Sequence, residues 1–281
     1  MIKAFEKLNK KITNKDEFMN VLTELRENSK DYIVEPNKMA VLPADNGDLS
    51  IAFKDKEYIM NETAKKELAL KLRIPYTYFQ MLQMTGHETL LLKNINELLQ
   101  SYNRTFMIRT TGDIGRAVLS NRFKRLDNLE VAEAVMKNMN INELKVKEYA
   151  ITLDQMYIKF INPTIYDEIE PGDVVNAGFM ISNSETGMLQ LNIAGFYERL
   201  VCKNGMVFSD VTGNFKMKHL GKAIYVDTDN EHYKELPSTR INDYDFWKYN
   251  AAISQGLKNT VDNEKFLDAI RKMRNLKNVK I

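Results

Sequence analysis

The nine residues from 120 to 128, SNRFKRLDN, contain side chains that could bind a nucleic acid. Three basic residues, Arg122, Lys124 and Arg125, surround the single aromatic residue Phe123. Guanidinium and ammonium groups bind phosphate oxygens, and an aromatic ring can stack on an unpaired base. The pattern predicts a nucleic-acid-binding surface, and the alternative is a polar junction where a strand enters a helix.

Basic residues are concentrated in two regions, although the formal net charge of the whole chain is only +2. Residues 101–125 contain six basic residues and one acid, and residues 199–222 contain five lysines and arginines and one acid. Such segregation can steer an anion to one face of a nearly neutral protein, although the charges could also be scattered over the surface. The predicted nucleic-acid-binding residues are Arg109, Arg116, Arg122, Phe123, Lys124, Arg125, Arg199, Lys203, Lys216, Lys218 and His219.

Sequence signatures of catalysis are absent. No GxxxxGK[ST] run that could cradle phosphates is present, and the three histidines are far apart in the sequence. Cys202 with His219 could form a nucleophile and base only if the fold brought them together, so we expect no catalytic residue, no metal and no cofactor. A metal-dependent enzyme remains the weakest alternative, and its candidate ligands are Asp127, Glu185, Glu198 and Asp210.

Composition places the chain among globular proteins. Of its 281 residues, 44% are hydrophobic and 28% are charged. Its single cysteine excludes an intramolecular disulfide, and no stretch approaches the roughly 18 apolar residues of a membrane span. The first residues, MIKAFEKLNKK, lack the apolar core of a signal peptide. These features predict a cytoplasmic protein without membrane contact.

The elements that would position the basic residues can be predicted from periodicity. A hairpin within residues 105–128 turns at Gly112–Gly115, and alternation along its second strand would put Arg116 and Arg122 on one face if that strand runs unbroken. Asp127 or Asn128 would cap the helix that follows. Upstream we expect a helix over 16–27, strands in 41–60 joined by a turn at Asn46-Gly47, a helix capped by Asn61, and a helical segment over 74–84.

The second half of the chain is expected to be rich in strands. We predict one long strand over 147–161, a turn at Pro171-Gly172, strands over 173–184 and 188–196, and a helix over 196–206. The predicted fold is α+β, a mainly antiparallel sheet built from hairpins with helices on one face and a helical C-terminus. Three segments are expected: an N-terminal α/β part over residues 1–100, a β-rich core with the basic hairpin over 101–235, and C-terminal helices over 236–281. A single domain that contains all three is the alternative.

Four stretches of roughly residues 50–225 resemble a phage and plasmid protein family known as domain of unknown function 932. They are AKKELALKLRIPYTYF, VLSNRFKRLDN, NSETGMLQLNIAGFYERLVCKNGM and KHLGK. The family has no assigned activity, so the resemblance implies a mobile element in a bacterial host and not a reaction. The positions that match the recurring residues of the family are Arg122, Asp127, Asn128, Asn183, Ser184, Gly187, Arg199, Cys202, Asn204 and His219. Many relatives have His-Asp or a similar pair after Asn-Ser, where this chain has Glu185-Thr186, so the resemblance implies no histidine role in this loop.

These observations lead to two hypotheses. The first is a protein that binds single-stranded DNA in recombination or replication, without ATP and as a homo-oligomer, in the broad manner of single-strand annealing proteins. The second is a protein that binds and inhibits a host defence or replication protein, with the polar loop at Asn183 and Ser184 in the interface. Dependence on nucleic acid distinguishes the two.

Overall fold

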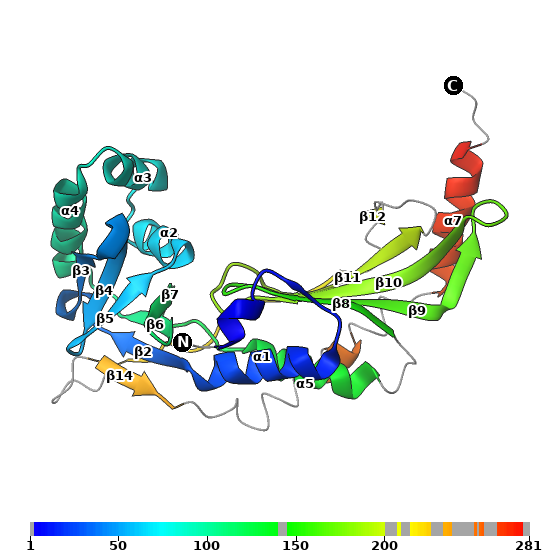
Figure 1. Cartoon of the computed structure of the whole chain (residues 1–281), viewed down its shortest axis with the longest axis horizontal. Coiled ribbons are helices and arrows are strands. Elements are labelled where there is room, and N and C mark those ends of the chain that lie inside the picture. Colours follow the sequence, from blue (N-terminus) through cyan, green and yellow to red (C-terminus); the bar gives the residue numbers. More distant parts are fainter. Residues whose placement is uncertain are drawn as a thin grey trace.

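The computed structural model describes residues 3–139, 145–199, 207–208, 214–225, 233–237, 250–251, 253–255 and 263–277. It has the predicted α+β fold, in which two mainly antiparallel sheets lie end to end (Figure 1). Each sheet carries its own helices and its own hydrophobic core.

Sheet B lies at the end of the molecule that contains most of the N-terminal half of the chain (Figure 1). Its strands follow the order β14-β2-β6-β7-β5-β4-β3, and only β5 and β7 are parallel. In chain order the strands are β2 (Ser29–Val34), β3 (Ala40–Pro43), β4 (Leu49–Phe53), β5 (Lys56–Met60), β6 (Phe106–Thr111), β7 (Ile114–Ser120) and β14 (Tyr233–Leu236). The sheet therefore draws strands from both sides of position 100, and β14 runs across position 235; segment boundaries were expected at both positions.

Sheet A follows the order β1-β8-β9-β10-β11-β12, with β13 also paired to β11. Its strands are β1 (Lys11–Ile12), β8 (Lys145–Ile151), β9 (Met156–Glu168), β10 (Val174–Asn183), β11 (Leu191–Arg199), β12 (Val207–Phe208) and β13 (Asn214–Met217). Every pairing in this sheet is antiparallel.

The helices begin where the sequence supplies a cap. Asn14 accepts a hydrogen bond from the backbone N–H of Glu17 at 3.0 Å, and Asn61 accepts one from that of Ala64 at 2.8 Å. The α-helices are α1 (Lys15–Glu27), α2 (Glu62–Lys71), α3 (Tyr76–Met84), α4 (Glu88–Ser101), α5 (Asn128–Met139) and α7 (Asn263–Lys277). Short 3-10 helices are η1 (Lys3–Lys7), η2 (Pro36–Lys38) and η3 (Asp45–Gly47).

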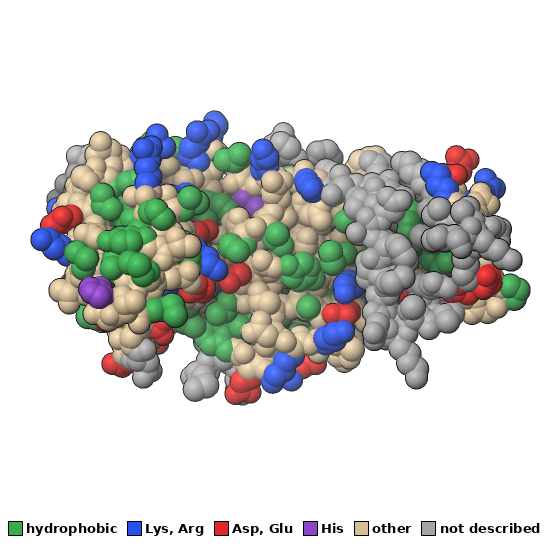
Figure 2. All heavy atoms as spheres, turned by 90° about the horizontal axis from the view of Figure 1, so that it is seen from above, with side chains coloured by type: hydrophobic (Ala, Val, Ile, Leu, Met, Phe, Trp, Pro, Cys, Tyr) green, Lys and Arg blue, Asp and Glu red, His purple; other side chains and the backbone are tan. Residues whose placement is uncertain are grey.

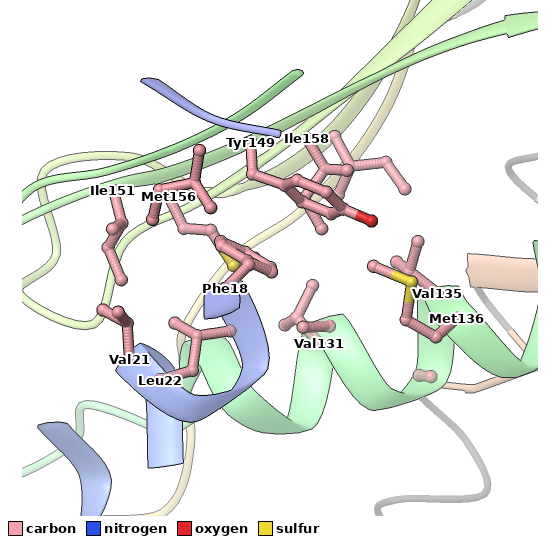
Figure 3. Packing of buried hydrophobic residues seen from close by; sticks show 14 of the residues in the cluster. Phe18, Val21, Leu22, Val131, Val135, Met136, Tyr149, Ile151, Met156 and Ile158 are labelled. Atoms are coloured by element: carbon pink, nitrogen blue, oxygen red, sulfur yellow. The ribbon is translucent and has the colours of Figure 1, made fainter. Parts of the chain in front are cut away.

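Helices α1 and α5 cover one face of sheet A (Figure 1). Phe18 of α1 stacks on Tyr149 of β8 with 4.4 Å between ring centroids, and Val131 of α5 packs beside them (Figure 3). Helices α2, α3 and α4 pack on sheet B around a second core that contains Leu68 and Phe79. Both cores form because apolar residues at helical spacing meet the inward residues of the strands.

Three sequence predictions are tested by the strands of sheet A. The expected strand over 147–161 is two strands, because residues 152–155 turn the chain between β8 and β9. The expected helix over 196–206 begins instead with strand, since β11 continues to Arg199 and pairs with β10, β12 and β13. Its residues 200–206 lie outside the described residues. The turn at Pro171-Gly172 is confirmed, with Gly172 at a positive φ of 85°.

Candidate functional site

Arg109 of β6 is buried where the two sheets meet, with 2% of its surface exposed. Its guanidinium donates to both carboxylate oxygens of Asp31 on β2, at 2.6 and 3.1 Å. It also donates to the Asp127 carboxylate at 2.6 Å and to the backbone oxygen of Glu185 at 2.8 Å. One side chain therefore connects sheet B to the start of α5 and to the loop after β10.

Arg116 of β7 is buried in the same region, with 1% of its surface exposed. Its Nη1 donates to the Glu185 carboxylate at 2.9 Å and to the Thr111 hydroxyl at 3.1 Å. Its Nε donates to the backbone oxygen of Leu153, in the turn between β8 and β9, at 3.0 Å. Arg116 thus joins sheet B to two loops of sheet A.

Further ion pairs extend these contacts into one connected set. Arg26 of α1 lies 2.8 Å from the second oxygen of Asp127, and Arg125 lies 3.3 Å from Asp31. The other carboxylate oxygen of Glu185 accepts the backbone N–H of Asn128 at 2.7 Å. We call the following residues the charge network: Arg26, Asp31, Arg109, Arg116, Arg125, Asp127 and Glu185.

The ionised state of Asp127 is set by its neighbours. Burial alone would raise the pKa of this carboxyl, but the charges of Arg109 and Arg26 outweigh burial and hold the pKa below its usual value. Asp127 therefore stays ionised at neutral pH, and its partner Arg109, whose pKa these carboxylates raise, stays charged. Charges buried to this extent are tolerated only when they are paired and hydrogen-bonded, as these are.

The charge network corrects the sequence prediction for Arg109 and Arg116. Both were expected to line an exposed groove for phosphates, and both are instead enclosed by carboxylates and backbone oxygens of the protein. Arg116 and Arg122 do not share a face of one strand, because β7 ends at Ser120 and only Arg122 is exposed. Arg125, half-buried, also binds Asp31 and the backbone oxygen of Pro237.

Residues 121–125 lie beside residues 219–224, so the structure brings part of the two basic regions together. The backbone N–H of Lys124 donates to the backbone oxygen of His219 at 3.2 Å, and that of Gly221 donates to the backbone oxygen of Arg122 at 2.8 Å. Asn121 exchanges hydrogen bonds with the backbone of Ile224, at 3.0 and 2.9 Å. These bonds fix two segments about one hundred positions apart in a single strand-like pair.

Four exposed cations lie within this pair or up to three residues before its second segment, and we call them the basic patch: Arg122, Lys216, Lys218 and Lys222. Within the described ranges, no acidic side chain forms an ion pair with any of them. Lys216 lies in β13 opposite Asn192 of β11. Lys and Arg side chains gather along one edge of the face that Figure 2 shows.

Phe123 and His219 directly follow two members of the basic patch, Arg122 and Lys218, in the sequence. Phe123 is buried in a small core with Leu119 and stacks on the His219 ring with 5.2 Å between centroids. The prediction that Phe123 could stack on a base is therefore corrected, because its ring is packed in this core. Burial lowers the pKa of His219 to about 4, so its imidazole is neutral at pH 7 and adds no charge to the basic patch.

Glu67 of α2 lies near the same core. Its carboxyl accepts the backbone N–H of Val118 at 2.8 Å, and burial raises its pKa to about 8. A Cβ placed on Gly187 would lie 3.5 Å from a Glu67 oxygen and 3.5 Å from the Phe123 ring. Glu67 is therefore mostly protonated at neutral pH, and it brings no negative charge to this region.

The polar loop at Asn183 and Ser184 is fully buried. Asn183 donates to the backbone oxygen of Leu126 at 3.0 Å and to the Asn128 side chain at 2.9 Å. The Ser184 hydroxyl accepts the backbone N–H of Met188 at 3.1 Å. These residues hold the loop that carries Glu185, and they do not form the exposed interface that was one of the hypotheses.

The remaining candidates are dispersed. Arg199 is the last residue of β11, and Glu198 beside it pairs with Lys147. Lys203 lies outside the described residues, as do Cys202 and Asp210. In the parts of the chain that the structure describes, no three His, Cys, Asp or Glu side chains form a group that could hold a metal ion, and no helix is long and apolar enough to cross a membrane.

Sequence reasoning missed three residues at the basic patch. Lys222 belongs to the second basic region, and Leu220 and Tyr225 expose 62% and 67% of their surfaces beside it. Their proximity in sequence to Lys218 was the available signal. It was not decisive, because nothing local distinguishes an exposed tyrosine from a buried one.

Comparisons with protein-family models, with curated proteins and with solved structures found no match to this chain. The resemblance to domain of unknown function 932 therefore stays a prediction.

We expect Asp127→Asn to lower the free energy of unfolding by about 3 to 5 kcal/mol at pH 7, because it leaves Arg109 and Arg26 buried with too little negative charge. The folded pKa of Asp127 is depressed, so its contribution is present above the unfolded pKa of about 4 and is lost as pH falls through the folded value. The stability of the variant should accordingly depend less on pH in that acidic range. Urea unfolding from pH 2 to 7 measures both effects.

The matched control is Asp167→Asn, since Asp167 pairs with Arg274 at 2.6 Å but both side chains are partly exposed. We expect this control to lose less than about 1 kcal/mol. Equal losses in the two variants would contradict the role assigned to the charge network.

Proposed function

We propose that this protein binds single-stranded DNA through the basic patch. The observation that carries the proposal is the pairing of residues 121–125 with 219–224, which gathers cations from two distant parts of the sequence. The positive charges of the patch are not paired with carboxylates of the protein. Within the described residues, no acidic side chain forms an ion pair with Arg122, Lys216, Lys218 or Lys222. A polyanion is the class of partner that such a surface attracts.

The buried charge network supports the proposal indirectly. Arg109 and Arg116 are neutralised inside the protein, so they neither attract a ligand nor oppose one at the surface. With His219 and Glu67 uncharged, the local field comes from the exposed lysines and Arg122. Binding by exposed cations is expected to be sensitive to salt, because each neutralised phosphate releases counterions.

The biological setting follows from the resemblance alone. A phage or plasmid protein that binds single strands would act in recombination or replication, including annealing of complementary strands. The chain contains no P-loop sequence, and the proposed activity requires no ATP.

Replacing Arg122, Lys216, Lys218 and Lys222 together by glutamine should weaken binding to a labelled oligothymidine and reduce its salt dependence. For single strands the slope of log affinity against log salt falls by about 0.7 for each phosphate that the protein no longer neutralises, so four phosphates correspond to a change of about 3. Fluorescence anisotropy across a salt series measures the slope.

The control replaces four exposed lysines away from the basic patch, Lys10, Lys15, Lys38 and Lys56, by glutamine. It changes the net charge equally and should leave the slope nearly unchanged. Absence of binding by the unmodified protein at low salt, or the same loss in both quadruple variants, would refute the proposal.

Exposed apolar side chains favour a second candidate function, which is protein–protein association through the helical end of the molecule. Figure 2 shows hydrophobic side chains gathered over the end that contains α3 and α4 in Figure 1. The exposed residues are Leu70, Tyr78, Met81, Met84, Leu90 and Leu98. An open groove of about 460 Å³ is lined by two of them, Tyr78 and Leu98, and also by Arg73 and Glu97.

We propose that the occupant of this groove is a second copy of the chain. In a two-fold interface residue i contacts residue j and j contacts i, so Arg73 of each copy could pair with Glu97 of the other. Apolar contacts would then hold the two copies together, with the two Arg73–Glu97 ion pairs at the edge of the interface. A host protein in place of the second copy would correspond to the inhibitor hypothesis.

Light scattering after gel filtration should give a dimer or larger species for the unmodified protein. Leu98→Lys, in the groove, should shift the population toward monomer, because it puts a charge into an apolar contact. Leu220→Lys is the control, since Leu220 is exposed but pairs with Phe123 and does not line the groove. A monomer at every concentration, or equal behaviour of both variants, would rule out self-association through this groove.

A further inference from the structure

We infer that Tyr225 is the base-stacking residue of the nucleic-acid site, and that it makes the site select unpaired bases over duplex. This inference rests on the proposed function. Tyr225 takes the stacking role that the sequence predicted for Phe123, because the Phe123 ring is buried against His219 and is out of reach of a ligand.

The backbone directly before Tyr225 is anchored to the first basic region. Ile224 donates its backbone N–H to the Asn121 backbone oxygen at 3.0 Å, and it accepts a bond from the Asn121 side chain at 2.9 Å. The Tyr225 side chain nevertheless exposes 67% of its surface. A ring on an anchored backbone loses little entropy when a ligand packs on it, in contrast to a ring on a free loop.

The neighbours of Tyr225 are those that a single-strand site requires. Lys222 lies three residues before it, and Arg122 adjoins the pair at Gly221. Leu220, 62% exposed, adds an apolar surface in the same segment. Cations can hold the phosphates while the ring contacts the face of a base, which is the arrangement by which proteins bind single strands without regard to sequence.

Stacking on Tyr225 is open only to an unpaired base. In a duplex the base faces are already stacked on each other, and only the phosphates can reach the basic patch. The selectivity for single strands therefore depends on one side chain, while the electrostatic part of the affinity is shared by both ligands.

The test compares Tyr225→Ala and Tyr225→Phe by anisotropy at low salt, with a labelled oligothymidine and a duplex of the same length. Tyr225→Ala should bind the single strand about 5- to 140-fold more weakly and the duplex about as well as the unmodified protein does. Tyr225→Phe keeps the ring and should retain most of the affinity. Tyr166→Ala is the control, because Tyr166 is 60% exposed on β9, away from the basic patch.

The outcomes separate the two proposals. If the unmodified protein binds neither ligand, the proposed function fails, and this inference fails with it. If it binds both but Tyr225→Ala retains its single-strand affinity, or loses affinity for both ligands equally, the stacking role is overturned and the basic patch stands.

Discussion

The burial of two arginines where the sheets meet is the constraint on which the rest of the structure depends. Arg109 binds Asp31 in its own sheet, and it binds Asp127 and the backbone of Glu185 beside the other sheet. Arg116 makes a second connection through the Glu185 carboxylate and Leu153. Because an unpaired charge at this depth would cost several kcal/mol, the two sheets must keep the relative placement that satisfies both guanidiniums.

The same constraint places the basic patch. Asp127 and Asn128, held by Arg109 and Glu185, begin α5 and fix the end of the segment from Asn121 onward. That segment pairs with residues 219–224 and so determines where the exposed lysines lie. The buried arginines position the surface cations, although they do not themselves reach a ligand.

Local pattern predicted the elements but not the partners of the charged residues. The helix over 16–27 was found at Lys15–Glu27 because Asn14 and the spacing of Phe18, Val21 and Leu22 are local signals. Strand alternation in the basic hairpin could not show that Arg109 is covered, since its partners are 78 residues earlier and 18 and 76 residues later in the chain. The helical spacing that begins at residue 196 misled for a related reason: up to Arg199 the chain pairs with β10 and β12, and this pairing outweighs local preference in β11.

The most direct test of the account is to map where a single strand contacts the protein. An oligonucleotide carrying 4-thiothymidine can be cross-linked by ultraviolet light and the attached peptides identified by mass spectrometry. The account predicts cross-links in peptides that contain residues 121–125 and 216–225, and their loss at high salt. Cross-links confined to α3 and α4, or to the face of sheet A covered by α1 and α5, would contradict it.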